Sequence, residues 1–354
     1  MTSGQRLRFW LIGLALALAL LYVLRGMLLP FVAGMAVAYF LDPLADRLER
    51  AGLSRLAATS VITASFFLVV VVALAILVPV IEDQVLAFAH KVPGYVDTLN
   101  ERLQPLLVEA KKRLSPRDIE KLRSSVGEYA GTFASWGLGA LRSVLSGSLA
   151  VFNVLSLVFI TPVVTFYLLR DWDKMVARVD SWLPRDHADT IRTQMKEINR
   201  TLSGFIRGQA TVCLCLGLIY GIGLSVVGLD LGLVIGLGAG VLSFIPYLGS
   251  IAGFVTGMGL ALAQGADWHL PVFVAVVFAI GQVAEGNFLT PKLVGDKVGL
   301  HPVWIMFALL AFAALFGFVG LLLAVPLAAV IGVLVRFALG RYLSSPLYHG
   351  HGPQ

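Results

Sequence analysis

The acidic residue placed deepest in the apolar carboxy-terminal half of the sequence is Glu285, near the end of a run that begins at Pro271. A carboxyl group inside a membrane is costly unless it is paired, protonated or in contact with water. Glu285 is therefore a candidate for proton or cation chemistry. In the alternative interpretation it lies at the membrane interface, one turn from a loop, and helps to fix Asn287 and Lys292.

Two glutamines, Gln209 and Gln282, bring amide donors and acceptors into otherwise apolar segments. Such amides would suit a polyol or a borate-like solute, but they would equally serve to hydrogen-bond one helix to another, at about 0.6 to 2 kcal/mol. Gln209 precedes Pro246 by 37 residues and Gln282 precedes Pro326 by 44 residues, which suggests a weak internal repeat. Arg207 would pair with an anion or, as we prefer, extend toward cytoplasmic headgroups.

Two apolar runs, residues 231–263 and 302–335, are too long to be simple upright helices. At 1.5 Å per residue each would measure about 50 Å, whereas the hydrocarbon core is about 30 Å thick. Pro246 interrupts the first run, and Gly317 and Gly320, followed by Pro326, interrupt the second. We expect broken helices whose free backbone groups bind a solute or ion near the membrane midplane.

Other kinds of chemistry lack their usual residue patterns. The six histidines are dispersed, and Cys213 and Cys215 would point to nearly opposite faces of a helix. The sequence has no motif typical of intramembrane proteases or serine hydrolases and no phosphate-binding loop of the Walker type. It therefore predicts a protein that is not an enzyme, binds no cofactor or metal ion, and is not driven by ATP.

The composition is that of an integral membrane protein. Of 354 residues, 58% are apolar and 14% are charged, against roughly half and a quarter in soluble domains. The net charge of +6 reflects Lys and Arg near the ends of apolar runs, so nucleic acid is not an expected partner. The fold class is all-α: a polytopic membrane protein with about eight spans, whose partner is the lipid bilayer. We place the spans at residues 9–24, 27–41, 57–80, 149–169, 206–227, 231–263, 271–289 and 302–335, the first as an uncleaved span.

The distribution of Lys and Arg predicts that both termini are cytoplasmic in a bacterial cytoplasmic (inner) membrane. The expected regions are 1–80 (first three spans), 81–147 (extracytoplasmic amphipathic helices), 148–170 (fourth span), 171–205 (cytoplasmic linker helices), 206–340 (carboxy-terminal membrane domain with broken helices) and 341–354 (cytoplasmic tail). The amphipathic helices of 81–147 would pack against neighbouring copies, so we expect a homo-oligomer. Region 171–205 is either an interfacial helix or a hinge between the two halves.

Several short motifs occur in order along the chain: residues 28–31 (LLPF), 41–43 (LDP), 205–209 (FIRGQ), 245–249 (IPYLG), 285–295 (EGNFLTPKLVG), 300–302 (LHP), 317–320 (GFVG) and 324–327 (AVPL). Together they resemble the AI-2E family of bacterial membrane proteins, over nearly the whole chain. One departure is the alanine-rich stretch 311–314, where the family often has glycines. The resemblance implies export of the signalling molecule autoinducer-2, and some members resemble sodium or lithium/proton antiporters.

The residues and the resemblance together predict a secondary transporter. The first hypothesis is export of a small polar solute such as an autoinducer-2-like molecule; the alternative is a sodium (lithium)/proton antiporter, and a scaffold or an enzyme with an unrecognised site is less favoured. The candidate substrate or ion pathway comprises Gln209, Pro246, Tyr247, Gly249, Gln282, Glu285, Asn287, Pro291, Gly320 and Pro326.

Overall fold

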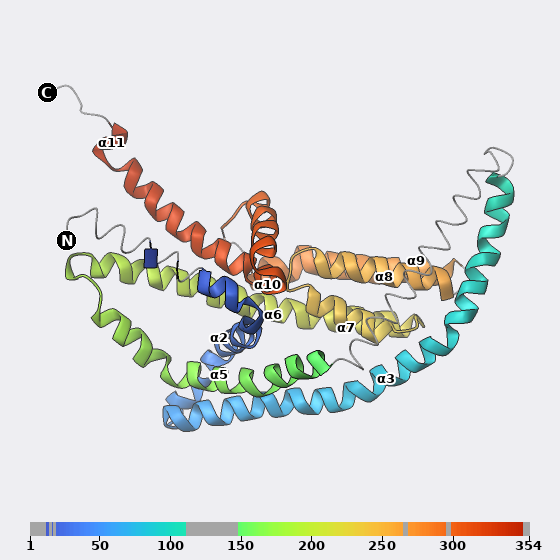
Figure 1. The fold of residues 1–354 in the computed structure, drawn as a ribbon, viewed down its shortest axis with the longest axis horizontal. Helices are drawn as coiled ribbons and strands as arrows, with labels where there is room; N and C mark the ends of the chain where they lie inside the picture. Colours follow the sequence, from blue (N-terminus) through green and yellow to red (C-terminus); the bar gives the residue numbers. More distant parts are fainter. Residues whose placement is uncertain are drawn as a thin grey trace. The chain divides into compact units, whose positions relative to one another are not determined.

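A computed structural model describes residues 12, 13, 16, 19–110, 148–264, 268–294 and 299–349 (Figure 1). Within these ranges every regular element is helical, which confirms the predicted all-α class. The elements are η1 (Leu24–Met27), α2 (Leu28–Arg50), α3 (Arg55–Ala110), α5 (Ser148–Ser181), η2 (Arg185–His187), α6 (Ala188–Val226), α7 (Gly232–Leu242), α8 (Leu248–Gln264), α9 (His269–Ala284), η3 (Glu285–Val294), α10 (Pro302–Leu343) and α11 (Pro346–His349).

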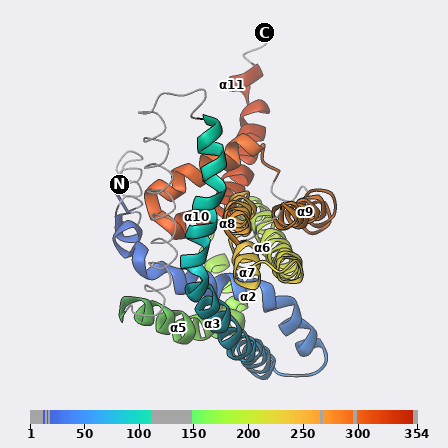
Figure 2. The same ribbon diagram turned by 90° about the vertical axis from the view of Figure 1, so that its right-hand side faces the viewer.

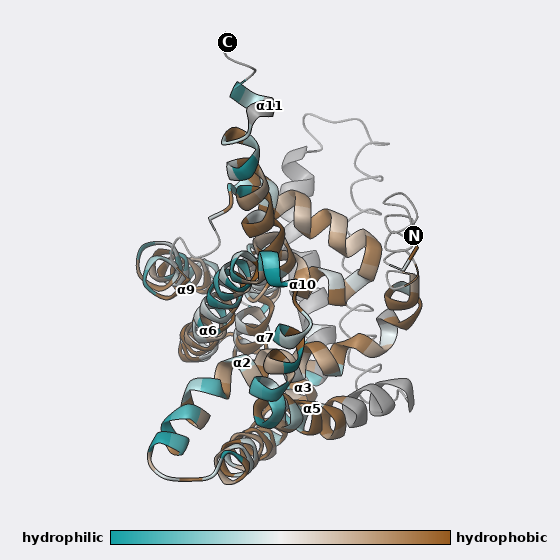
Figure 3. Cartoon of the chain, turned by 90° about the vertical axis from the view of Figure 1, so that its left-hand side faces the viewer, coloured by the Kyte–Doolittle hydropathy of each residue, from teal (hydrophilic) through white to brown (hydrophobic). Residues whose placement is uncertain are grey.

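Five helical segments among the described residues are long and apolar enough to cross a membrane: Leu28–Arg50, Arg55–Phe88, Arg185–Val226, His269–Val294 and Pro302–Leu343. Many of their apolar side chains are exposed; Leu68 and Val69 of α3, for example, are 64% and 66% exposed. Figure 3 shows that hydrophobic residues cover most of the helices and that hydrophilic residues gather in short stretches. The chain is a multi-pass membrane protein.

The count of about eight spans stays a prediction. The expected first span, 9–24, lies largely outside the described residues, and α5 covers the expected span 149–169. Residues 81–110 continue α3 as a helix, whereas 111–147 fall outside the described part of the chain. Region 171–205 contains the end of α5, η2 and the beginning of α6, with a break between Ser181 and Arg185, and its role as a cytoplasmic linker stays a prediction.

The chain forms two compact units. Unit 1 comprises Met1–Phe67, Ser156–Ala210 and Thr290–Gln354, and unit 2 comprises Leu68–Leu155 and Thr211–Leu289.

In unit 1, α2 packs closely on α5. A side chain at Gly34 would lie 2.7 Å from a methyl group of Val164, so only glycine permits this approach. The Thr165 hydroxyl donates to the Gly34 carbonyl at 3.2 Å and to the Thr161 carbonyl at 2.8 Å. A small apolar core lies beside this contact, formed by Ala38, Leu41, Ala45 and Leu169. Small residues and one shared hydroxyl thus hold the two helices together.

In unit 2, α6 and α7 lie side by side (Figure 2), and they pack through pairs of glycines. A side chain at Gly236 would collide with the backbone at Gly221, and one at Gly240 would collide with Gly217. The backbones of the two helices therefore lie in direct contact. Without a hydrophobic driving force between helices in lipid, close packing of this kind supplies much of the association energy.

The apolar run 231–263 is interrupted, in agreement with the prediction. Helix α7 ends at Leu242 and α8 begins at Leu248, with Pro246 in the turn between them. Tyr247 has a positive φ of 68°, which is uncommon for a residue with a side chain. The chain folds back as a hairpin, because Gly249 and Gly253 of α8 both approach Ala239 of α7.

The run 302–335 is also interrupted, and the break lies at Gly317. This residue has φ 60° and ψ −136° inside α10, a conformation that favours glycine. Gly320 follows in a position where a side chain would overlap the Phe312 carbonyl oxygen. Pro326 is buried within the helix that continues after the break. The predicted interruption of this run is therefore present, but Pro326, one of the residues expected to cause it, lies inside a continuous helix.

Candidate functional site

Three polar side chains form a hydrogen-bonded chain in unit 2. The Gln282 amide nitrogen donates to Glu285 Oε2 at 3.0 Å and to the Tyr220 hydroxyl at 3.3 Å. Gln282 and Glu285 lie three residues apart at the carboxyl end of α9, so both project from one face of the helix. Tyr220 is fully buried on α6, and Glu285 is half-buried. We call these three residues the Glu285 cluster.

The position of Tyr220 depends on its apolar neighbours. Its ring stacks on Phe278 of α9, with 4.6 Å between centroids, and Phe254 of α8 packs edge-on against the same Phe278 ring. A side chain at Gly281 would collide with the Tyr220 ring, so the glycine makes room for it. Sequence reasoning missed Tyr220; the signals available were a tyrosine within an apolar run and a glycine directly before Gln282.

Glu285 is also the first residue of η3, a π-helical segment of ten residues. In a π-helix the hydrogen bonds join residues i and i+5. Such segments are rare in proteins, and those that occur are often found at functional sites. Asn287 and Pro291 both lie in this segment, with Asn287 exposed. The π-helical segment thus begins at Glu285, the residue whose carboxyl group the sequence analysis identified as a candidate.

The other predicted residues are distributed over both units. Pro246, Tyr247 and Gly249 belong to the α7–α8 hairpin of unit 2, where Tyr247 is 55% exposed and Gly249 packs against Ser243. The residues of the prediction that belong to unit 1 are Gln209, Pro291, Gly320 and Pro326. The structure brings Gln282 and Glu285 into contact, while the predicted pathway as a set stays a prediction.

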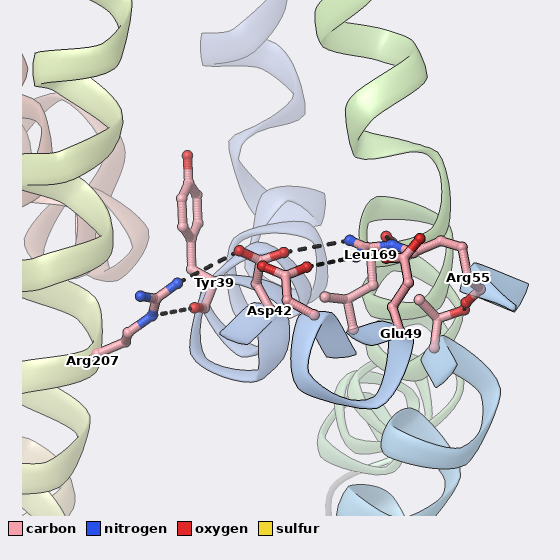
Figure 4. A network of polar contacts seen from close by, with 8 residues as sticks. Tyr39, Asp42, Glu49, Arg55, Leu169 and Arg207 are labelled. Atoms are coloured by element: carbon pink, nitrogen blue, oxygen red, sulfur yellow. Dashed lines mark hydrogen bonds and ion pairs between the residues drawn. The ribbon is translucent and has the colours of Figure 1, made fainter. Parts of the chain in front are cut away.

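A second polar network lies in unit 1 (Figure 4). Arg55 of α3 donates to Asp46 at 2.7 Å and to Glu49 at 3.1 Å, and its Nε donates to the Leu169 carbonyl at 3.0 Å. Asp42 makes longer contacts, at 3.5 Å to Arg55. The network joins α2, α3 and α5, and with 18% exposure the Arg55 side chain is largely enclosed by its partners.

Arg207 of α6 approaches the same network from the other side of Asp42. Its Nε donates to the Tyr39 carbonyl at 2.9 Å, and its Nη2 lies 3.6 Å from Asp42 Oδ2. Arg207 thus faces an anion, which agrees with the first of the two interpretations of this residue, and its extension toward headgroups stays a prediction. Ion pairs inside helix bundles compensate charges that lipid cannot solvate.

A cavity of about 250 Å³ lies beside Asp42 and Arg207 in unit 1. It is lined by Met35, Ala38, Tyr39, Asp42, Pro43, Asp46, Leu168, Leu169, Trp172, Asn199, Ser203 and Arg207. The sequence offered one signal, since Asp42, Asp46 and Glu49 recur at helical spacing before Arg55. The partnership with Arg207 lies far away in the sequence and has no local signature.

Further ion pairs involve α5 where it extends beyond the apolar span. Arg170 donates to Asp171 at 2.6 Å, and this hydrogen bond lowers the pKa of Asp171. Arg192 donates from Nε and Nη2 to the two oxygens of Asp180, at 2.7 and 2.9 Å, which lowers the pKa of Asp180. The second pair ties the end of α5 to the start of α6.

Metal chemistry has no support in the described ranges, where no three His, Cys, Asp or Glu residues gather as a set of metal ligands. The carboxylates of the unit 1 network instead face guanidinium groups.

Comparison with known proteins gives matches over nearly the whole chain. The family model described as "AI-2E family transporter" matches residues 11–340. The chain is 31% identical to "Putative transport protein YrrI" of Bacillus subtilis (strain 168), over 88% of this chain and 87% of the relative. It is 28% identical to "Putative permease PerM" of Escherichia coli (strain K12), over 92% and 91%. A third relative, "Putative transport protein YhhT" of the same strain, is 25% identical over 93% and 89%.

Proposed function

Because the chain belongs to the AI-2E transporter family, we propose that it is a secondary transporter that exports a small polar solute, such as an autoinducer-2-like signalling molecule. The relatives carry the names "Putative transport protein YrrI" and "Putative permease PerM", which supports solute movement across a bilayer. The sequence lacks a Walker-type loop, so an ion gradient is the proposed source of energy. We place the protein in the bacterial cytoplasmic membrane with both termini inside.

The observation that carries this proposal is the Glu285 cluster. It places a carboxyl group, an amide and a phenol hydroxyl in contact within apolar helices. The amide and hydroxyl would bind the hydroxyl groups of a polar solute, and the carboxyl group would bind a proton or a cation. An ionisable group within a membrane span is expensive and is functional by default.

The same carboxyl group favours a second candidate, a sodium or lithium/proton antiporter. In such a cycle Glu285 would bind a proton and a cation in turn, because one carboxylate cannot hold both at once. No separate binding site for an organic solute would be needed. The two candidates differ in whether solute crosses the membrane together with the ion movement.

Purified protein in liposomes separates the candidates. Vesicles loaded with a labelled small polyol are given a pH gradient or a sodium gradient, and polyol efflux and internal pH are followed together. An exporter predicts gradient-dependent polyol flux, and an antiporter predicts a pH change on addition of sodium or lithium without any polyol. Protein-free vesicles give the background rate. Absence of both signals in correctly inserted, folded protein would contradict the proposed function.

A further inference from the structure

We propose that the unit 1 cavity binds a small zwitterionic solute of the α-amino acid type, with its ammonium group at Asp42 and its carboxylate at Arg207. The lining contains none of the residues of the Glu285 cluster. The inference does not depend on the transported solute proposed above, and it concerns binding at a second site.

Asp42 is the carboxylate of the network with the longest contacts to cations. Arg55 holds Asp46 at 2.7 Å, whereas Asp42 lies 3.5 Å from Arg55 and 3.6 Å from Arg207. Charge-assisted N–H···O bonds are normally about 2.7 to 2.9 Å long. A ligand ammonium group in the cavity would therefore approach Asp42 more closely than either guanidinium does.

Arg207 is positioned to bind the other end of such a ligand. The hydrogen bond from its Nε to the Tyr39 carbonyl fixes the guanidinium plane at the cavity wall. Its Nη2 faces Asp42, so a ligand that carries an ammonium and a carboxylate on one carbon would meet both charges at once. Guanidinium groups recognise carboxylates through paired, directional hydrogen bonds.

The charges of the lining disfavour simpler ligands. Two carboxylates, Asp42 and Asp46, and one guanidinium, Arg207, face the cavity. An amine alone would interact with Asp42 but not with Arg207, and a carboxylic acid alone would interact with Arg207 but not with Asp42. A neutral polyol would displace water from charged groups without compensating them, which is costly. A zwitterion compensates charges of both signs.

The apolar part of the lining fits a short side chain. Tyr39 and Trp172 meet edge-on, with 5.8 Å between their centroids, and Met35 and Leu168 complete the apolar wall. The volume of about 250 Å³ is just below the range of about 300 to 1,000 Å³ typical of ligand pockets. The cavity therefore favours a small amino acid over a peptide or a nucleotide.

Calorimetric titration of the purified full-length protein in detergent tests the proposal with four related probes. These are norvaline, butylamine (without the carboxylate), pentanoate (without the amine) and pentane-1,2-diol (without either charge). Norvaline should bind at least about tenfold more tightly than each of the other three, since each of the others lacks at least one of the two charge contacts. Equal binding of all four, or binding of none, overturns the proposal.

Substitutions of the two charged residues should change the selectivity in opposite directions. Asp42→Asn should weaken the binding of norvaline and shift the preference toward pentanoate. Arg207→Gln should shift the preference toward butylamine. Loss of folding would weaken the binding of all four probes alike, and it would be seen as a lowered melting temperature. In that event the ranking of the four probes on the wild-type protein decides the matter.

Asp186→Asn is the matched control, because Asp186 lies exposed in η2 and outside the cavity lining. It should keep the wild-type affinity and ranking of the probes. A wild-type ranking in both cavity variants, or the same loss in Asp186→Asn, would contradict binding at this site.

Discussion

At the scale of single residues, glycine positions decide which polar groups meet. Gly281 permits the Tyr220 ring to lie against α9, where its hydroxyl accepts from Gln282. A tyrosine hydroxyl buried in lipid-facing helices would be costly without such a partner. The Glu285 cluster therefore depends on a residue that has no side chain of its own.

Gly281→Ala should destabilise the protein by about 1 to 3 kcal/mol, because the added methyl group collides with the Tyr220 ring. Thermal unfolding in detergent, followed by intrinsic fluorescence, measures the change. Gly259→Ala is the control in α8, since no atom lies within 4 Å of the position that its methyl group would occupy. A melting temperature for Gly281→Ala equal to that of Gly259→Ala would show that the close approach is unimportant.

At the scale of elements, the extensions of α5 and α6 are joined by the Asp180–Arg192 ion pair. Arg192 lowers the pKa of Asp180 by hydrogen bonding, so the folded state favours the charged carboxylate. The resulting stabilisation is present above the pKa of an unfolded aspartate, about 3.9, and is lost as the pH falls through the lower value of the folded state.

Asp180→Asn should therefore melt below the wild-type protein at pH 7, and the difference should shrink as the pH falls below about 4. The effect should be small, because both side chains are exposed. Asp186→Asn serves as a control in the neighbouring η2 and should show no such pH-dependent difference. A gap between Asp180→Asn and wild type that stays constant down to pH 3 would contradict this role of the ion pair.

The sequence predicted elements better than contacts between them. The run 231–263 exceeds the membrane thickness and contains Pro246, which was sufficient to predict the break between α7 and α8. The second break occurs at Gly317, because glycine tolerates a positive φ that a helix cannot otherwise accommodate. Pro326 was an equally reasonable candidate, but prolines are tolerated inside membrane helices.

Local spacing likewise explains which part of the candidate sites was predictable. Gln282 and Glu285 lie three residues apart, so their contact follows from helix geometry. Tyr220 comes from a distant helix, and the partnership of Arg207 with Asp42 also joins distant segments. Neither contact has a periodic signal, because both result from tertiary packing.

At the scale of the whole molecule, the family and the apolar helices define a multi-pass membrane transport protein. We propose in addition that Glu285 carries the proton or cation whose gradient drives transport. A carboxyl group at that position binds and releases a proton only if water or solute reaches it during the cycle. The amide of Gln282, at 3.0 Å, would then hold the carboxylate in place.

The most direct test compares wild type, Glu285→Gln and Glu197→Gln in proteoliposomes. Polyol and cation flux are measured at several pH values, beside a thermal melt of each preparation. Glu197 lies exposed on α6, outside the Glu285 cluster, and serves as the matched acid. We predict that Glu285→Gln loses the pH dependence of flux while its melting temperature stays near that of wild type, and that Glu197→Gln behaves as wild type. Wild-type flux with unchanged pH dependence in folded Glu285→Gln would contradict the account.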